Sequence, residues 1–171
     1  DWAVAALSVL GEGGIAAVDI NSVCKHLGVT RGSFYWHFAD LGALHAAMAQ
    51  RWCEETKQTL QQLDELAKLP PLDRIRAMSM HLLDDSNWGV ERALRAWART
   101  EPSVAQVLEE GDRFVFSLVE SALLEMRGDA ADARVLAGLL VYAGIGFAHG
   151  QSGLPKPTVA DLERLLALVT A

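Results

Sequence analysis

Residues 29–38 (VTRGSFYWHF) carry side chains that together could recognise a nucleic acid. Phe34 and Phe38 are four residues apart, so in a helix they share one face. The remaining faces then present a guanidinium group, a hydroxyl group, an imidazole and two further aromatic rings. An apolar inner edge with outward donors and aromatic rings is what a helix needs to dock in the major groove of DNA. We therefore interpret this segment as a DNA-recognition helix.

Local signals predict a second helix before this one, with a turn between them. Asp19 is the predicted N-cap of a helix over 20–27, because its carboxylate can accept hydrogen bonds from the amides of the first turn. Gly28 suits the left-handed position that closes this helix. Thr30 is the predicted N-cap of the recognition helix, over about 31–37. Helix, glycine turn and helix form a helix-turn-helix, a pattern that has low specificity when it stands alone.

The rest of the chain also predicts helices. Helical periodicity is nearly continuous and strand signals are scarce, so we expect an all-α fold. The predicted helices cover about residues 1–11, 20–27, 31–37, 41–68, 72–85, 88–99, 102–126, 131–151 and 159–169. The first three are expected to form a DNA-binding domain over residues 1–45. The long helix that starts at 41 would join it to a helical bundle over residues 46–171.

The distribution of charge favours nucleic-acid binding more than the total does. The net charge is −7, which at first argues against a polyanionic partner. Yet residues 20–39 contain no acidic residue and carry Lys25, His26, Arg31 and His37. Only the contacting face of a DNA-binding protein must be positive. We therefore expect an acidic body with a neutral-to-basic DNA-binding end.

Several other function classes find no support in the sequence. There is no HExxH motif, nucleophile elbow or phosphate-binding loop, so we expect no enzyme, catalytic residue or cofactor. Cys24 and Cys53 form no CxxC pair, and we interpret them as reduced thiols of a cytoplasmic protein without a metal site. No apolar run reaches the length needed to span a bilayer, so no membrane partner is expected.

The order of residues over about 3–48 resembles the N-terminal region of TetR-family transcriptional repressors. The segment reads ALSVLGEGGIAAVDINSVCKHLGVTRGSFYWHFADLGALHAAM. Its most specific pieces are the EGG turn after the first helix, the LGV turn and the run that ends in Tyr-x-His-Phe. The resemblance implies a cytoplasmic homodimer that binds a palindromic operator in double-stranded DNA, with recognition helices about 34–36 Å apart. It also implies a helical body that binds an effector and forms the dimer.

The resemblance assigns base-reading roles to one side of the recognition helix. Arg31 and Ser33 would reach base edges, since arginine can donate two hydrogen bonds to a guanine. Gly32 would let the helix approach the groove closely. Trp36 would lie along the groove, against a thymine methyl group or a sugar. On an isolated helix Trp36 would more often belong to a core, but Phe34 and Phe38 already fill the inward face.

The same resemblance assigns contacts with the DNA backbone. Thr30, at the helix N-terminus, would bind a phosphate through its hydroxyl group and its amide. Tyr35 and His37 would hold the sugar-phosphate chain, although a histidine here could also be an ordinary surface residue. The family often has lysine at the position of Leu41, so one backbone contact is absent and DNA affinity could be lower.

The predicted body is rich in large apolar and amphipathic side chains. In a helical bundle such residues could line a cavity for a largely apolar or aromatic effector. The alternative for any one of them is simple core packing. The predicted ligand-binding residues are Trp52, Met78, His81, Trp88, Trp97, Phe114, Tyr142 and Phe147.

A glycine-interrupted apolar stretch predicts a dimer interface. Residues 131–151 carry Gly138, Gly144, Gly146 and Gly150 among large apolar residues, and small residues let two helices approach closely. With the last helix, this segment could form a four-helix interface with a second copy; the alternative is the central core helix of a monomer. Effector binding would then favour a form whose recognition helices are wrongly spaced for DNA. The alternative function is a TetR-like ligand-binding module with weak or lost DNA binding.

Overall fold

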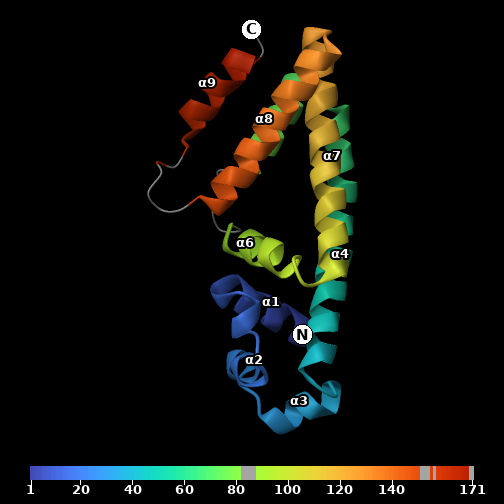
Figure 1. The fold of residues 1–171 in the computed structure, drawn as a ribbon, viewed down its shortest axis with the longest axis vertical. Helices are drawn as coiled ribbons and strands as arrows, with labels where there is room; N and C mark the ends of the chain where they lie inside the picture. The colour runs from blue at the N-terminus through green and yellow to red at the C-terminus, as the bar shows by residue number, and fades with distance from the viewer. Residues whose placement is uncertain (82–87, 151–154, 156, 170–171) are drawn as a thin grey trace. The chain divides into compact units, whose positions relative to one another are not determined.

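The computed structural model describes residues 1–81, 88–150, 155 and 157–169 (Figure 1). Within these ranges the regular structure is helical and no strand occurs, as the sequence predicts. The helices are α1 (Trp2–Gly13), α2 (Ile20–Leu27), α3 (Arg31–His37), α4 (Leu41–Leu63), α5 (Pro71–His81), α6 (Trp88–Trp97), α7 (Pro102–Arg127), α8 (Ala130–His149) and α9 (Val159–Val169). Two short 3-10 helices accompany them, η1 (Ile15–Ala17) and η2 (Asp64–Lys68).

The chain forms two compact units, and α4 and α7 supply residues to both of them. The first unit contains 1–59 and 89–109, and the second contains 60–88 and 110–171. The first unit is thus larger than the DNA-binding domain predicted over 1–45, because most of α4, α6 after Trp88 and the start of α7 also belong to it. That functional division at residue 45 stays a prediction.

The core of the first unit packs the three N-terminal helices against α4 and α6. Phe34 of α3 and Leu44 and Met48 of α4 are fully buried, and Trp97 of α6 lies in the same cluster. α1 and α6 approach closely, since a Cβ atom added at Gly11 would lie 2.8 Å from Cγ2 of Val90. A side chain at position 11 would therefore push α6 away. The sequence gives no local signal for this contact.

The core of the second unit is built from α5, α7, α8 and α9. Its buried residues are Ile75, Val119, Ala122, Leu123, Ala133, Ala137, Leu162, Leu166 and Val169. On its surface, Arg76 of α5 binds Glu163 of α9 through two hydrogen bonds of 2.8 and 3.1 Å. The hydrogen bond from Arg76 lowers the pKa of the Glu163 carboxyl from its ordinary value.

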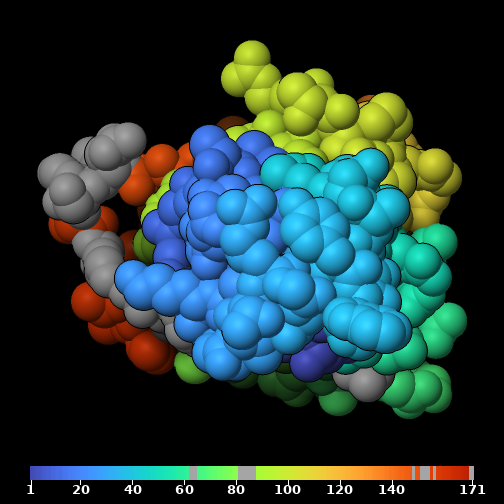
Figure 2. All heavy atoms as spheres, turned by 90° about the horizontal axis from the view of Figure 1, so that it is seen from below, coloured from blue at the N-terminus to red at the C-terminus, as the bar shows by residue number. Residues whose placement is uncertain are grey.

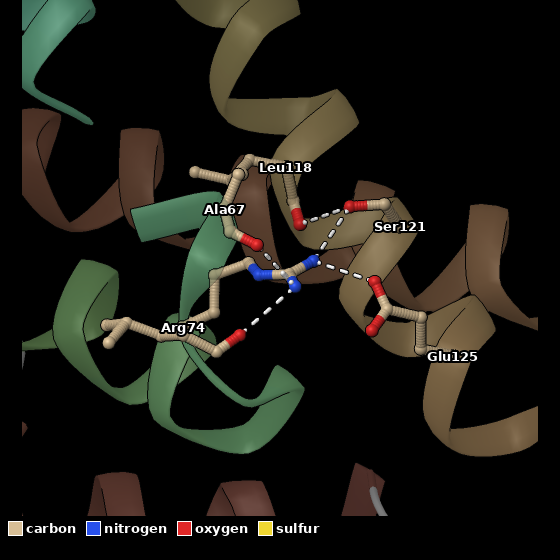
Figure 3. Close-up of polar contacts among 6 residues, drawn as sticks. Ala67, Arg74, Leu118, Ser121 and Glu125 are labelled. Atoms are coloured by element: carbon tan, nitrogen blue, oxygen red, sulfur yellow. Dashed lines mark hydrogen bonds and ion pairs between the residues drawn. The ribbon is translucent and has the colours of Figure 1, made fainter. Parts of the chain in front are cut away.

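Arg74 is a buried cation in this second unit (Figure 3). Its guanidinium group donates to the carbonyl groups of Ala67 and Leu69, at 2.9 and 3.1 Å. It also donates to Ser121 and Glu125 on α7, at 3.1 and 3.0 Å. Buried polar groups need such partners, because water cannot supply them. Arg74 therefore joins the segment around η2 to α7.

Most predicted helix boundaries within the described residues agree with the structure within two residues, and the end of α4 is the exception. The helix expected to reach residue 68 ends at Leu63, and the chain continues as the 3-10 helix η2. Pro70 and Pro71 follow η2, and proline removes backbone donors and fixes φ, which favours an early end of the α-helical pattern. The predicted end of α5 near residue 85, the predicted N-cap Asn87 and the end of α8 at Gln151 lie outside the described residues.

α8 is the most apolar long helix of the described chain. Residues 130–147 have a mean hydropathy of 1.4, and the helix is long and apolar enough to cross a membrane by length and composition alone. The sequence prediction that no segment has this property was wrong, because it considered only uninterrupted apolar runs and this stretch contains Asp132 and Arg134. A helix at an interface of a soluble protein can have the same composition. Length and composition therefore do not distinguish a membrane-spanning helix from an interface helix.

We predict that Arg74→Met lowers the free energy of unfolding by about 1–3 kcal/mol, the usual cost of leaving buried polar groups without a partner. The two carbonyl groups and the Ser121 hydroxyl group would lose their donor. Urea denaturation followed by circular dichroism measures the change. Arg76→Met is the matched control, because its ion pairs are exposed to solvent and contribute little. An equal effect of the two substitutions would contradict the prediction.

Candidate nucleic-acid interface

The predicted capping residues define the helix-turn-helix. The Asp19 carboxylate accepts hydrogen bonds from the amides of Asn21 and Ser22, at 2.7 and 2.9 Å, and starts α2. Gly28 ends α2 with φ of 68°, in the left-handed region that suits glycine. The Thr30 hydroxyl group then accepts from the amide of Ser33 at 3.3 Å and starts α3. The caps at Asp19 and Thr30 and the left-handed glycine at position 28 thus set the start of each helix and the turn between them.

Burial of one side chain sets the direction of the others on α3. Phe34 has 0% of its surface exposed, whereas Tyr35 is 53% exposed and Trp36 is 89% exposed. His37 is also exposed. Figure 2 shows the end of the first unit on which α2, α3 and the start of α4 form one surface, coloured blue to cyan. A tryptophan with so much free surface has no packing role within its own unit and is available to a partner.

The N-terminal turn of α3 presents a second set of groups. Arg31 is exposed, and Ser33 is half-buried with its hydroxyl group 3.3 Å from that of Thr30. A Cβ atom at Gly32 would meet only the Thr30 hydroxyl oxygen, at an ordinary 3.5 Å. Alanine would therefore fit here and would favour the helix by about 1 kcal/mol. Nothing within the described chain requires glycine at this exposed position.

The interface is free of carboxylates, and the two that flank it are engaged. Asp19 caps α2, and Asp40 accepts a hydrogen bond from the amide of Ala43 at 2.8 Å at the start of α4. Hydrogen bonds from Ser22 and Asn21 lower the pKa of the Asp19 carboxyl, and the positive charge of Arg31 adds to this effect. Both carboxylates thus hold helix N-termini, where negative charge is stabilised.

Leu41 occupies the position at which the resemblance leads us to expect lysine. Its side chain is half-buried and packs against the core of the first unit. A lysine there could extend toward a phosphate, but the shorter apolar leucine side chain carries no charge. The phosphate contact that the resemblance assigns to this position is therefore absent.

Trp2 is a member of this region that sequence analysis overlooked. Its indole ring lies 5.7 Å from the ring of Phe34 and 6.1 Å from that of Phe38, measured between centroids. It also lies 5.7 Å from the His37 imidazole. In the sequence Trp2 was only one element of the apolar period of the first helix. The contact with α3 joins residues more than thirty positions apart, which periodicity alone cannot indicate.

Comparison with known proteins identifies this N-terminal region. Residues 4–48 match the family model described as bacterial regulatory proteins, tetR family. Over 83 residues the chain is 30% identical to the HTH-type transcriptional regulator AcrR of Shigella flexneri. Residues 4–48 are thus similar to the N-terminal domain of tetR-family regulators. The match with AcrR covers 47% of this chain and 38% of AcrR, so the chain spans well under half of that relative's length.

Solved structures with the same fold cover nearly the whole chain. A transcriptional regulator from Rhodococcus sp. Rha1 superposes with a TM-score of 0.70, covering 99% of this chain and 91% of that one, at 21% identity. A regulator of the TetR/AcrR family from Thermobifida fusca gives a TM-score of 0.56 over 99% and 94%, at 17% identity. At such identities the likeness concerns the fold alone: an N-terminal helix-turn-helix domain and a helical C-terminal body.

The residues predicted to bind an effector are divided between the two units. Trp52 and Trp97 pack in the core of the first unit, where Trp97 meets His45 with ring centroids 6.3 Å apart. Met78 packs against the core of the second unit. These three residues belong to the separate hydrophobic cores of the two units, and their role in ligand binding stays a prediction.

The remaining predicted residues differ in exposure. Trp88 and Phe114, in the second unit, are half-buried. On α8, Tyr142 is 74% exposed and Phe147 is 37% exposed. The His81 side chain lies outside the described part of the chain. Among the described residues of the predicted set, Trp52 of the first unit and Met78, Trp88 and Phe114 of the second have the partial exposure that a ligand contact needs.

Proposed function

We propose that this TetR-family chain is a transcriptional regulator, most simply a repressor, that binds double-stranded DNA through α3. The observation that carries the proposal is the division of α3 into a fully buried Phe34 and an outward side with Tyr35 and Trp36 largely exposed. This outward side lies within twenty residues that contain no carboxylate. A helix of this kind can enter the major groove without repelling the phosphates.

Within this proposal, Arg31, Ser33 and Trp36 contact base edges and Gly32 allows the close approach. The fold has room for a side chain at position 32, so folding does not require a glycine there. Close approach of the helix to DNA would explain the glycine. Thr30, Tyr35 and His37 contact the backbone, with Thr30 at the positive N-terminus of the helix.

The proposed operator is a palindrome read by a two-fold dimer. An exposed apolar face supports a dimer: Val135, Leu139 and Tyr142 follow one another at helical spacing on α8 and are 62%, 62% and 74% exposed. On α9, Leu168 is 64% exposed. Contiguous apolar surface of this kind usually marks a binding site. A second copy of the chain can cover the same face of both subunits at once.

An effector site in the second unit is part of the proposal. Met78, Trp88 and Phe114 are half-buried apolar side chains of this unit, so each keeps surface that a small apolar ligand can contact. Ligand binding there would oppose DNA binding, and the coupling must be reciprocal. A regulator of this type works where the DNA is, in the cytoplasm. The second candidate is an effector-binding module with weak DNA binding, which the apolar Leu41 favours.

We expect Arg31→Ala to relax base preference at one position of each half-site, at a cost of about 1–3 kcal/mol, because a base contact is lost. Tyr35→Phe and His37→Ala should weaken binding to all sequences about equally, because they remove backbone contacts. Selection from a randomised duplex library gives the sequence preference, and titrations at several salt concentrations give the affinity.

The control for Arg31 is Arg99→Ala, which removes an exposed arginine outside the helix-turn-helix. It should leave both preference and affinity unchanged. If Arg31→Ala keeps the wild-type preference, Arg31 does not read bases. If the unmodified chain selects no sequence and its weak binding lacks salt dependence, the second candidate is favoured.

Leu139→Lys should convert the dimer to monomer, because a cation would enter the proposed apolar interface. Sedimentation velocity at micromolar concentration measures the oligomeric state. The matched control is Gln58→Lys, the same change of charge at an exposed position of α4. A monomeric unmodified protein, or a Leu139→Lys variant that stays dimeric, would refute the interface on α8.

Trp88 offers an optical test of the effector site. It is the sole tryptophan in the sequence of the second unit, while Trp2, Trp36, Trp52 and Trp97 belong to the first. We expect uncharged aromatic compounds that release DNA to quench tryptophan fluorescence. Trp88→Phe should abolish the quenching, whereas Trp52→Phe should retain it. Quenching that disappears with Trp52 instead would place the site in the first unit.

A further inference from the structure

Trp2 contacts the C-terminal half of α3, the proposed recognition helix. Its indole meets the rings of Phe34 and Phe38 edge-on, with interplanar angles of 80° and 82°. Edge-on contacts of this type are a favourable arrangement of aromatic rings. Phe34 is the buried residue of α3, and Phe38 at its C-cap packs against the same core, so the two contacts contribute to packing. They require a large apolar side chain at position 2 and no more.

The contact between Trp2 and His37 has a different character. The imidazole is exposed and belongs to the surface that we propose faces DNA, so packing does not require it to touch anything. Yet its ring centroid lies 5.7 Å from that of the indole, with the planes inclined by 50°. The indole thus lies beside the imidazole. An exposed side chain that would otherwise sample several rotamers is limited to those compatible with the indole.

The position of the indole is itself fixed by the start of α1. The Asp1 carboxylate accepts a hydrogen bond from the Ala3 amide at 2.9 Å and caps the helix. The other carboxylate oxygen lies 3.7 Å from the Arg51 guanidinium group of α4. The first turn of α1 is thus held from two directions. The capping hydrogen bond orders the backbone at Trp2, and the indole lies beside α3.

We propose that Trp2 is a positioning residue for His37: the indole orders the imidazole so that it can meet the DNA backbone. The inference rests on the proposed DNA-binding function and adds a residue of α1 to it. Pre-ordering a side chain lowers the entropy that binding would otherwise cost. The benefit of Trp2 for DNA binding therefore acts through His37, and this dependence distinguishes positioning from general support of the fold.

A double-mutant cycle tests that dependence. Trp2→Leu keeps an apolar side chain against Phe34 and Phe38 but removes the ring beside His37. It should weaken binding to the selected duplex by about threefold to tenfold, as expected for coupled residues in contact. The double variant Trp2→Leu/His37→Ala should bind no more weakly than His37→Ala alone. Additive losses would overturn the proposal, because Trp2 would then act independently of His37.

Two further variants separate positioning from loss of the fold. Trp2→Phe retains an aromatic ring and should restore most of the affinity. Val4→Ala alters an exposed residue of the same helix and should have no effect. If the Trp2→Phe variant binds the duplex as weakly as Trp2→Leu, with an unchanged melting temperature, an aromatic ring at position 2 does not determine the DNA affinity. That result would contradict the proposal.

Nuclear magnetic resonance of the free protein tests the geometry without DNA. The ring current of the indole should shift the His37 imidazole protons from their usual position, and Trp2→Leu should remove this shift while leaving those of His26 unchanged. His37 protons that do not respond would overturn the proposal. If they respond although the unmodified protein binds no duplex, the proposed function fails, while the positioning of His37 by Trp2 is confirmed.

Discussion

Burial of Phe34 is the contact on which the candidate DNA-binding surface depends. α3 contains only seven residues, and a helix of that length is not stable in water without tertiary contacts. Phe34 is the one buried residue of α3, and it packs in the core that α1, α2, α4 and α6 share. Successive residues of a helix point about 100° apart. Once Phe34 points inward, Tyr35 and Trp36 must therefore point to solvent.

Local charge matters more than net charge for such a surface. The chain carries a net charge of −7, yet the two carboxylates nearest to the helix-turn-helix, Asp19 and Asp40, accept hydrogen bonds at helix N-termini. Exposed charges separated by more than a Debye length, about 8 Å at physiological salt, are largely screened. A duplex would meet the groups of α3 first, Arg31 among them.

The sequence predicted what depends on neighbouring residues and failed where distant residues meet. Asp19, Gly28 and Thr30 were recognised because capping and left-handed glycine follow from residue type and position. The contact of Trp2 with His37 and the packing of α6 in the first unit depend on tertiary structure, which periodicity does not encode. The effector residues were chosen by type alone, so packing residues such as Trp97 were included in the predicted pocket.

The packing of α6 bears on how an effector could influence DNA binding. Trp88, at the start of α6, is assigned to the second unit, and Val90 two residues later packs closely against Gly11 of α1. Protein cores are dense and leave little room for one helix to move without its neighbour. Within the first unit, Val90 therefore has little room to move without displacing α1, which carries Trp2. Under the two proposals above, a change in the packing of α6 would thus also reach the residue proposed to order His37.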